Sequence, residues 1–370
     1  MYVKSKWDEI KISWSFRVKE WKFILKRISE SPLAVTGIAI IFGFLIIACL
    51  APILAPPQGP DPFIVPQDIE IATLTPNPTP PSTRHIFGTT DQQYDIYYAC
   101  IWGTISAFRV GLSVIIIALL IGLVIGTLSA YYGGIIDEIL MRITDIIIAF
   151  PGLLLAMVMA ITFPTVLPLD ITLLTLIITA IFSLTLIISK SRRKLLLAIL
   201  AVFVGDLFLY IYNPIIIPLN LSKLDKVLIS LALVSWPGYA RLIRSEVLRV
   251  KSEDFVEAAK VAGCSTLRII VKHIWPNTIY SLIIVSTLDI GSIVLTAAAL
   301  SFLGIGAEPN FADWGQIISR SRNWISRPDL LVANYHTFLI PGIFITLFVL
   351  GWNLLGDALR DVLDPMIRRR

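Results

Sequence analysis

The sequence predicts an all-α membrane protein, a polytopic bundle of about eight transmembrane helices. The chain has 370 residues, of which 56% are hydrophobic and only 15% charged, and its mean hydropathy is +0.80. A soluble protein of this size keeps about 25% charged residues, so much of this surface faces something other than water. Several runs also reach the roughly 20 apolar residues that a helix needs to cross a bilayer core about 30 Å thick. Both observations favour one membrane domain over a string of soluble domains.

The chain begins with a basic, amphipathic segment, residues 1–32. Its large apolar side chains recur at steps of three, four or seven: Trp7, Ile10, Trp14, Trp21, Ile24 and Ile28. This pattern predicts a cytoplasmic helix in the inner membrane interface, with its indoles at headgroup depth. A cytosolic helix that packs on a partner is the alternative. We expect no cleavable signal peptide, because the segment is polar and the first apolar run is long.

Eight apolar segments are then long enough to be predicted as spans. They are 33–54, 106–131, 146–167, 171–189, 195–217, 227–243, 277–302 and 338–359. The weakest is 227–243, which is short and contains Pro237 and Arg241. Residues 52–81, between the first two spans, hold ten of the 22 prolines, and such a stretch should be extended, non-helical and exposed. We therefore assign 55–105 to the extracellular side.

The distribution of basic residues predicts the orientation of the bundle. With a cytoplasmic N-terminus and eight alternating spans, 24 of the 31 Lys and Arg residues fall on the inner side. This agrees with the positive-inside rule. Removing one span between residues 171 and 243 would move the basic block Arg241–Lys272 outside. The charge bias thus supports the spans predicted between residues 171 and 243. It also supports a cytoplasmic basic tail at 367–370 and the placement of 244–276 on the inner face.

The most informative stretch is Glu257–Pro276, which reads EAAKVAGCSTLRIIVKHIWP. It is polar enough to lie outside the membrane, yet it carries apolar residues at helical steps: Val256, Ala259, Leu267, Ile270 and Val271. Gly263 suits a turn between two short helices, and Pro276 suits the first turn of the next span. The pattern predicts a cytoplasmic helix–turn–helix with an apolar stripe available to a partner.

This stretch resembles the cytoplasmic EAA loop of the permease subunits of prokaryotic ABC importers. Glu257, Ala258, Ala259, Gly263 and Pro276 match that motif in identity and spacing, whereas His273 and Trp275 stand where it has Ile and Leu. Further motifs resemble the dipeptide/oligopeptide branch of these importers. They are Phe87-Gly88-Thr89, Tyr131-Tyr132-Gly133-Gly134 with Asp137 and Met141-Arg142, Asp145 with Phe150-Pro151, Trp236 with Tyr239-Ala240-Arg241 and Arg244, LSFLGIG at 300–306 with Trp314-Gly315, and NLLGD at 353–357 with Leu359-Arg360-Asp361 and Leu363-Asp364-Pro365.

The resemblance covers about residues 84–165 and 227–366 and implies a type I ABC importer permease fold. Relatives have a core of six spans, so 171–217 would be an inserted hairpin within a permease core at 106–366. The implied partners are a homologous second permease, two ATPase subunits that bind ATP and Mg²⁺, an extracellular substrate-binding protein and membrane lipid, with no nucleic acid. This chain would itself bind no cofactor or metal and catalyse no reaction. Residues 56–105 and 303–337 would be candidates for contact with the binding protein.

The resemblance also implies which residues couple the chain to the ATPase. We expect Glu257, Ala258, Ala259, Gly263, Arg268, His273 and Pro276 to form or position the coupling helices. Glu257 would make polar contact with the ATPase, and Ala258 and Ala259 would pack closely. The alternative is that the small residues only pack the loop internally.

Two features depart from the pattern of relatives. The Arg that follows FGTD in relatives is missing from Thr90–Asp95, and the usual acidic residue falls at Ala297. Instead, Asp289 lies inside the seventh span, where an ionised Asp costs about 2.5–3.5 kcal/mol on insertion scales. We expect Asp289, with Ser292 and Thr296, to line the translocation path; snorkelling or helix capping is the alternative for Asp289.

Two other functional classes compete with the permease. A secondary transporter needs coupling-ion sites at mid-membrane and two repeated halves, and Asp206 and Asp289 are too few. An intramembrane enzyme needs clustered catalytic groups, but the three histidines are scattered and no HExxH or GxSxG occurs. No GxxxxGK[ST] is present either, so ATP must come from a partner. The sequence does not decide between peptides and oligosaccharides as substrate.

Overall fold

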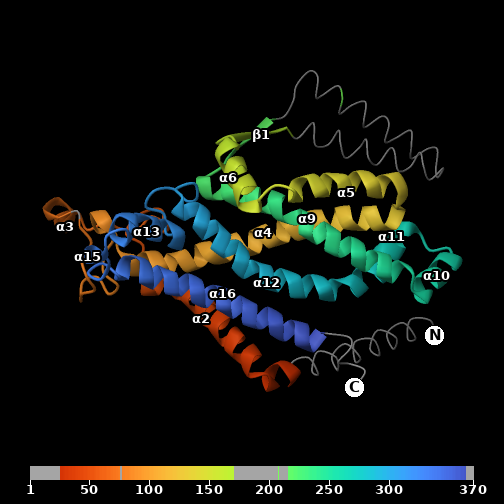
Figure 1. Ribbon diagram of the computed structural model, residues 1–370, viewed down its shortest axis with the longest axis horizontal. Coiled ribbons are helices and arrows are strands. Elements are labelled where there is room, and N and C mark those ends of the chain that lie inside the picture. Colours follow the sequence, from red (N-terminus) through yellow and green to blue (C-terminus); the bar gives the residue numbers. More distant parts are fainter. Residues whose placement is uncertain (1–25, 76, 171–206, 208–215, 364–370) are drawn as a thin grey trace, which may run out of the picture. The chain divides into compact units, whose positions relative to one another are not determined.

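The computed structural model describes residues 26–75, 77–170, 207 and 216–363. These residues form two units, the smaller being Thr162–Asp225. In the larger unit, five helices are long and apolar enough to cross a membrane. They are α2 Pro32–Leu54, α4 Ile96–Tyr132, α9 Lys223–Lys251, α12 Trp275–Phe302 and α16 His336–Leu363 (Figure 1). The all-α prediction is confirmed for this unit.

A bent pair of helices adds a sixth candidate span. α5 Gly134–Ile148 and α6 Gly152–Thr162 meet at 90°, whereas the sequence predicts a span at 146–167. The helix is broken within that span, because Pro151 lacks an amide hydrogen and disfavours helix at the residue before it. The count of eight spans is not confirmed, since 171–189 and nearly all of 195–217 lie outside the described residues, as do residues 1–25 and the tail 367–370.

The smaller unit has the only two strands found in the described residues. β1 Val166–Asp170 and β2 Ile216–Asn220 pair antiparallel, with Val166 opposite Asn220 and Asp170 opposite Ile216. The two ends of the inserted segment therefore lie side by side.

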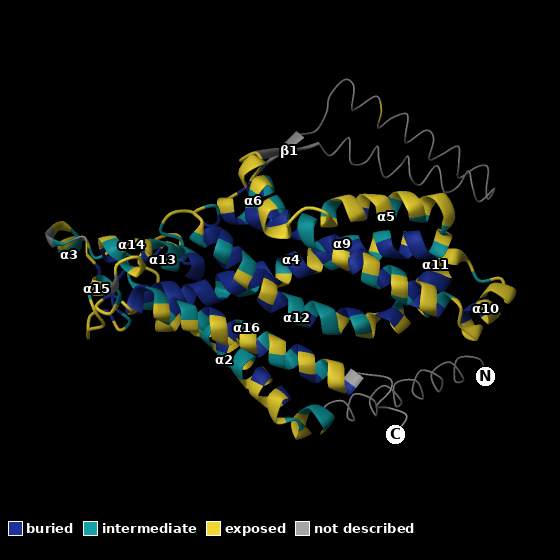
Figure 2. Cartoon of the chain, viewed as in Figure 1, coloured by how far each residue is buried: buried dark blue, intermediate teal, exposed yellow. Residues whose placement is uncertain are grey.

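Close helix packing builds the core of the larger unit. Gly37 of α2 and Gly351 of α16 allow these helices to approach, since a Cβ on Gly37 would lie 2.8 Å from the Leu355 nitrogen. Next to them is an aromatic cluster around Phe348, which is fully buried. Its members are Phe44, Phe108, Trp314, Phe344 and Phe348. Most of α2 outside this contact is exposed (Figure 2), as a helix that faces lipid requires.

The proline-rich segment is less extended than predicted. Asp68 caps a short helix, α3 Ile69–Leu74. This helix lies between Pro66 and Pro76, in a stretch that contains no proline. Residues 52–54 also belong to α2, and residues 96–105, within the segment 55–105 that we predict to be extracellular, form the first turns of α4. The structure differs from the predicted extended segment because no proline lies between Pro66 and Pro76, which leaves room for about one and a half helical turns.

The remaining short helices lie at the two ends of the bundle. They are η1 Asp91–Gln93, α10 Asp254–Val261, α11 Thr266–Ile269, the π-helical turn η2 Ile270–Ile274, α13 Trp314–Arg320, α14 Arg322–Ile325 and α15 Pro328–Leu331. Figure 1 shows α3, α13 and α15 at one end, and α10 and α11 at the other. The start of α2 and the end of α16 lie toward the end that carries α10 and α11, which is the arrangement that the predicted topology requires.

Candidate coupling site

The predicted coupling loop begins later than we expected. Residues 244–251, which the prediction assigned to the loop, form the last two turns of α9, and this helix is continuous through Pro237. Arg249 and Lys251 occupy its last turn, where positive charge is favourable at a helix C-terminus. The loop proper therefore starts at Ser252 and is directly attached to a membrane-length helix.

Two short helices follow, as the sequence predicts. Gly263 forms the turn between α10 and α11 with a φ of +77°, a left-handed conformation that favours glycine. The amide nitrogens of Gly263 and Cys264 donate to the carbonyls of Lys260 and Ala259 at 3.0 and 3.1 Å. These bonds satisfy the end of α10 in the manner of a glycine C-cap.

The apolar stripe of this loop is divided between two faces. Val256, Ala259 and Ile270 are buried within the chain, together with Ile269 and Ile274. Three apolar side chains point away instead, and Val261, Leu267 and Val271 are 90%, 71% and 43% exposed. The prediction that the stripe is available to a partner is therefore wrong for three of its five residues, since Val256, Ala259 and Ile270 are buried within the chain. The outward side chains form an exposed apolar tip.

The predicted coupling residues also divide between these faces. Glu257, Ala258, Gly263, Arg268 and Pro276 are exposed, whereas Ala259 is buried. His273 is half-buried, and its ring centroid lies 6.4 Å from that of Phe255. Pro276 lies in the first turn of α12, as predicted, and the π-helical turn η2 joins α11 to that helix without a break. The segments α11, η2 and α12 thus form one continuous helix, Thr266–Phe302.

The base of the loop is fixed to its neighbours by polar side chains. Lys251 donates to the carbonyl oxygens of Ala130 and Tyr131, at 3.2 and 2.7 Å, at the end of α4. Trp275 Nε1 donates to Thr127 Oγ1 of the same helix at 3.1 Å. The two helices that flank the loop, α9 and α12, are therefore both anchored to α4.

A second set of contacts joins α9 to α5. Arg244 makes a bidentate pair with Asp137, at 2.7 and 2.6 Å, and Arg241 pairs with Asp145 at 2.6 Å. All four residues belong to motifs noted in the sequence, but their pairing was not predicted. Opposite charges within two largely apolar segments were the available signal, because unpaired charges there would be costly.

The predicted path residues lie on one face of α12. Asp289 is half-buried, and its carboxylate accepts a hydrogen bond from the Tyr239 hydroxyl of α9 at 2.7 Å. Ser292, one turn later, is exposed, and Thr296, two turns later, is half-buried like Asp289; each hydroxyl donates to a backbone carbonyl of α12. The sequence did not predict Tyr239 as the partner of Asp289. Eight residues before Asp289, about two turns earlier on α12, Ser281 Oγ donates to Glu246 Oε1 at 2.8 Å, so α9 and α12 are joined at two levels.

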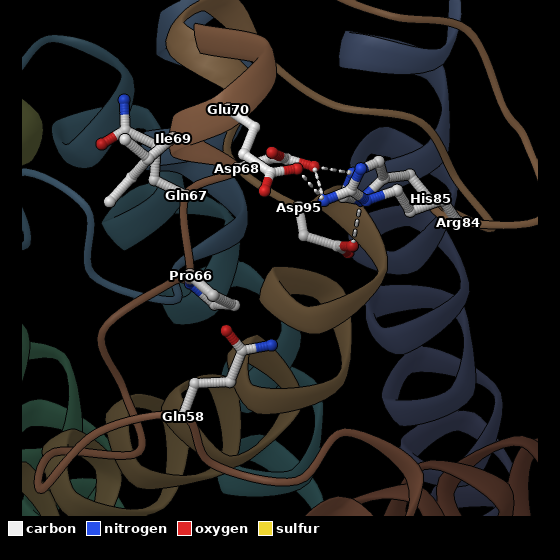
Figure 3. Close-up of a pocket in the computed structure, with 9 residues that line it drawn as sticks. All are labelled: Gln58, Pro66, Gln67, Asp68, Ile69, Glu70, Arg84, His85 and Asp95. Carbon is white, nitrogen blue, oxygen red and sulfur yellow. Dashed lines mark hydrogen bonds and ion pairs between the residues drawn. The ribbon is translucent and has the colours of Figure 1, made fainter. Parts of the chain in front are cut away.

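At the opposite end, an open pocket of about 380 Å³ lies beside α3 and the start of α4. His85 stands between two capping aspartates (Figure 3): its Nδ1 lies 2.7 Å from Asp95 and its Nε2 lies 3.3 Å from Asp68. Arg84 pairs with Asp68 at 2.9 Å. Burial raises the pKa of Asp68, but the Ile71 amide, His85 and Arg84 outweigh it, and the net pKa is lowered.

The segment that lacks an arginine after FGTD contacts an arginine of α13 instead. Asp91 pairs with Arg320 of α13 at 3.4 Å, and the guanidinium carbon of Arg320 lies 4.3 Å from the centroid of the Tyr94 ring. Burial raises the pKa of Asp91, and Arg320 opposes that rise. Phe63 and Phe311 stack at 5.2 Å nearby, so the segments before α4 and after α12 form one layer.

Comparisons with known proteins place this geometry in context. The family model described as the binding-protein-dependent transport system inner membrane component matches residues 118–369. A second model, the N-terminal TM domain of oligopeptide transport permease C, matches residues 19–76.

Three curated relatives cover most of the chain. The dipeptide transport system permease protein DppC of Alkalihalophilus pseudofirmus is 32% identical over 95% of this chain and 91% of its own length. The glutathione transport system permease protein GsiD of Pectobacterium atrosepticum is 30% identical over 78% and 75%. The oligopeptide transport system permease protein OppC of Bacillus subtilis is 28% identical over 94% and 90%.

Proposed function

This chain belongs to the family of binding-protein-dependent transport system inner membrane components, and on that premise we propose that it is the permease subunit of an ATP-driven peptide importer. Its multi-pass helical bundle is a type I ABC importer permease fold. The relatives named for dipeptide, oligopeptide and glutathione transport support a peptide substrate, with oligosaccharides as the alternative. The chain would enclose one path with a homologous permease in a prokaryotic cell membrane.

The observation that carries this proposal is the exposed tip between α9 and α12. A short helix pair that projects from two membrane-length helices, with Val261, Leu267 and Arg268 turned outward, suits insertion into a groove of a second protein. The partner we propose is an ATPase subunit that binds ATP and Mg²⁺ on the cytoplasmic side. Closure of two such subunits would move both coupling helices together and reorient the bundle.

The path would run along the face of α12 that carries Asp289, Ser292 and Thr296. Asp289→Asn preserves the size of the side chain and an acceptor for Tyr239 but removes the charge. If Asp289 lines the path, this variant changes transport at constant ATPase expression. Unchanged transport and unchanged coupling to ATP hydrolysis would remove Asp289 from the path.

Affinity purification of the full chain from its native membranes tests the proposed partner. The wild-type chain should co-purify with an ATPase subunit, and neither a secondary transporter nor an intramembrane enzyme predicts this. Leu267→Glu, which places a charge on the exposed tip, should reduce the recovered ATPase without reducing the amount of permease. Ile69→Glu is the matched control, because Ile69 is 70% exposed on α3 at the opposite end. Purification without any ATPase would contradict the proposal.

A further inference from the structure

Four charged side chains join α5 to α9, and none of them belongs to the coupling loop. Asp137 lies near the start of α5 and binds Arg244, whereas Asp145 lies near its end and binds Arg241, which precedes Arg244 on α9. The two helices therefore run in opposite directions along this contact. Asp137 and Asp145 are eight residues apart on α5, whereas Arg241 and Arg244 are three residues apart on α9. The two arginine side chains therefore leave one turn of α9 and reach carboxylates that are about two turns apart on α5.

The inner pair, Asp137 and Arg244, is the stronger of the two. Its side chains are 21% and 35% exposed, against 54% and 49% for Asp145 and Arg241. A bidentate pair between a guanidinium and a carboxylate gives strong and directional hydrogen bonds, while an exposed pair contributes little. Asp137 also accepts a hydrogen bond from Ser129 Oγ of α4, so this single carboxylate joins three helices.

Among the described residues, the other face of α5 is largely exposed. Ile135, Ile139 and Ile146 are 77%, 54% and 62% exposed. In the part of the chain that the structure describes, α5 is held through its polar face and its link to α4. Gly133 and Gly134 join α4 to α5, and both have positive φ, so α5 turns back sharply along α4.

Arg244 is also close to the coupling loop along the chain. It lies seven residues before Lys251, on the same helix that continues to within a short turn of α10. Because only Ser252 and Glu253 separate α9 from α10, a rigid movement of α10 pulls on this end of α9, while Lys251 and Trp275 hold the base of the loop to α4. Any such displacement of α9 acts on Asp137 through its bidentate pair with Arg244, because the two side chains cannot shift relative to each other without losing both hydrogen bonds.

We propose that the Asp137–Arg244 pair is the joint through which the coupling loop moves α5 and the bent segment α5–α6. Arg244 and Asp137 are positioning residues in this proposal, with no contact to substrate or nucleotide. The proposal deepens the permease function and depends on it. If the pair instead only stabilises the fold, breaking it should change the amount of folded complex and nothing else.

The test uses the complete importer, reconstituted in vesicles with its ATPase and binding protein, and measures peptide imported per ATP hydrolysed. Asp137→Asn and Arg244→Gln should keep ATPase binding and hydrolysis but lower that ratio by about fivefold or more, the scale of typical coupling energies. The exchange Asp137→Arg with Arg244→Asp should restore part of the ratio. Arg244→Lys keeps the charge but loses the planar fork, so it should give an intermediate ratio. This variant replaces the glutamine variant in the test if the glutamine variant fails to fold.

Arg249→Gln is the matched control. It removes one arginine from the same helix, and its partner Glu246 lies on α9 itself, so no link to α5 is lost. This variant should keep the wild-type ratio. Import that stays proportional to ATP hydrolysis in folded Asp137 and Arg244 variants would overturn the joint. An absence of ATP-dependent import in the wild-type complex would instead contradict the permease function itself.

Discussion

Gly263 shows how a single residue sets the geometry of the coupling loop. Its φ of +77° is accessible to glycine and, at some cost, to asparagine, while β-branched side chains are strongly disfavoured there. No atom lies within 4 Å of a Cβ built at this position, so the cost of a substitution arises from the backbone alone.

Gly263→Val should therefore change the angle between α10 and α11 and lower ATP-dependent transport. Strain of about 1–2 kcal/mol is expected at this position, too little to unfold the bundle. Gly263→Asn should retain most transport. The measurement compares vesicle uptake for both variants at matched expression, and equal activity would show that the turn is not required.

Asp68 has a measurable role on the opposite side of the bundle. It caps α3 through the Ile71 amide and also pairs with His85 and Arg84. Its folded pKa lies below the unfolded value of about 3.9. Its contribution to stability is therefore fully present above that unfolded value and is lost as the pH falls through the lower, folded pKa.

Two substitutions separate the charge of Asp68 from its cap. Asp68→Asn keeps a capping oxygen, so it should lower the melting midpoint at pH 7 only slightly and weaken the loss of stability below pH about 4. Asp68→Ala also removes the cap, which costs about 1 kcal/mol. Melting of the purified protein between pH 7 and 3 checks both. Identical curves for the two variants would contradict the capping role.

At the scale of elements, the paired strands suggest how the inserted segment is joined to the core. Asp170 and Ile216 face each other across the β1–β2 ladder. A two-residue Asn-Gly turn closes such an antiparallel pair with favourable twist. The structure therefore predicts a short connection that can replace the whole insertion.

We expect a chain in which Asn-Gly replaces residues 171–215 to fold and to bind its ATPase. The prediction follows because removing the two predicted spans of the hairpin leaves the coupling loop on the same side of the membrane. Expression level, melting midpoint and ATPase recovery measure the outcome. Loss of the folded permease would show that the insertion is part of the core.

Several elements could be predicted from sequence because one local property determined each. The predicted span at 33–54 coincides with α2 to within one residue, since its apolar run is bounded by Ser31 as N-cap. The turn at Gly263 was also predictable, because few residues other than glycine adopt its conformation. The bend at Pro151 was missed because hydrophobicity continues unbroken across it, although the proline itself was the signal.

The contacts within the site were harder to predict, for a physical reason. The Tyr239–Asp289 bond and the Arg244–Asp137 pair join residues 50 and 107 positions apart. Each residue alone has several possible partners, and only the packing of α9 against α4, α5 and α12 selects one. The sequence indicated which polar groups needed a partner, but the fold determined which partner each one has.

At the scale of the whole molecule, the central claim is that α10 and α11 dock on an ATPase at the cytoplasmic face. A chain in which Cys49, Cys100 and Cys264 are replaced by serine or alanine would allow single cysteines to be placed on either end of the bundle. Val261→Cys, at the exposed tip, and Ile69→Cys, on α3, are the matched positions, since both side chains are well exposed.

The most direct measurement is cross-linking of these two variants in membranes that contain the complete importer. We predict that Val261→Cys forms a covalent adduct with the ATPase subunit, that the adduct changes when ATP is added, and that Ile69→Cys forms no such adduct. An importer that transports peptide while Val261→Cys never reaches the ATPase, or that cross-links equally from Ile69→Cys, would contradict the account.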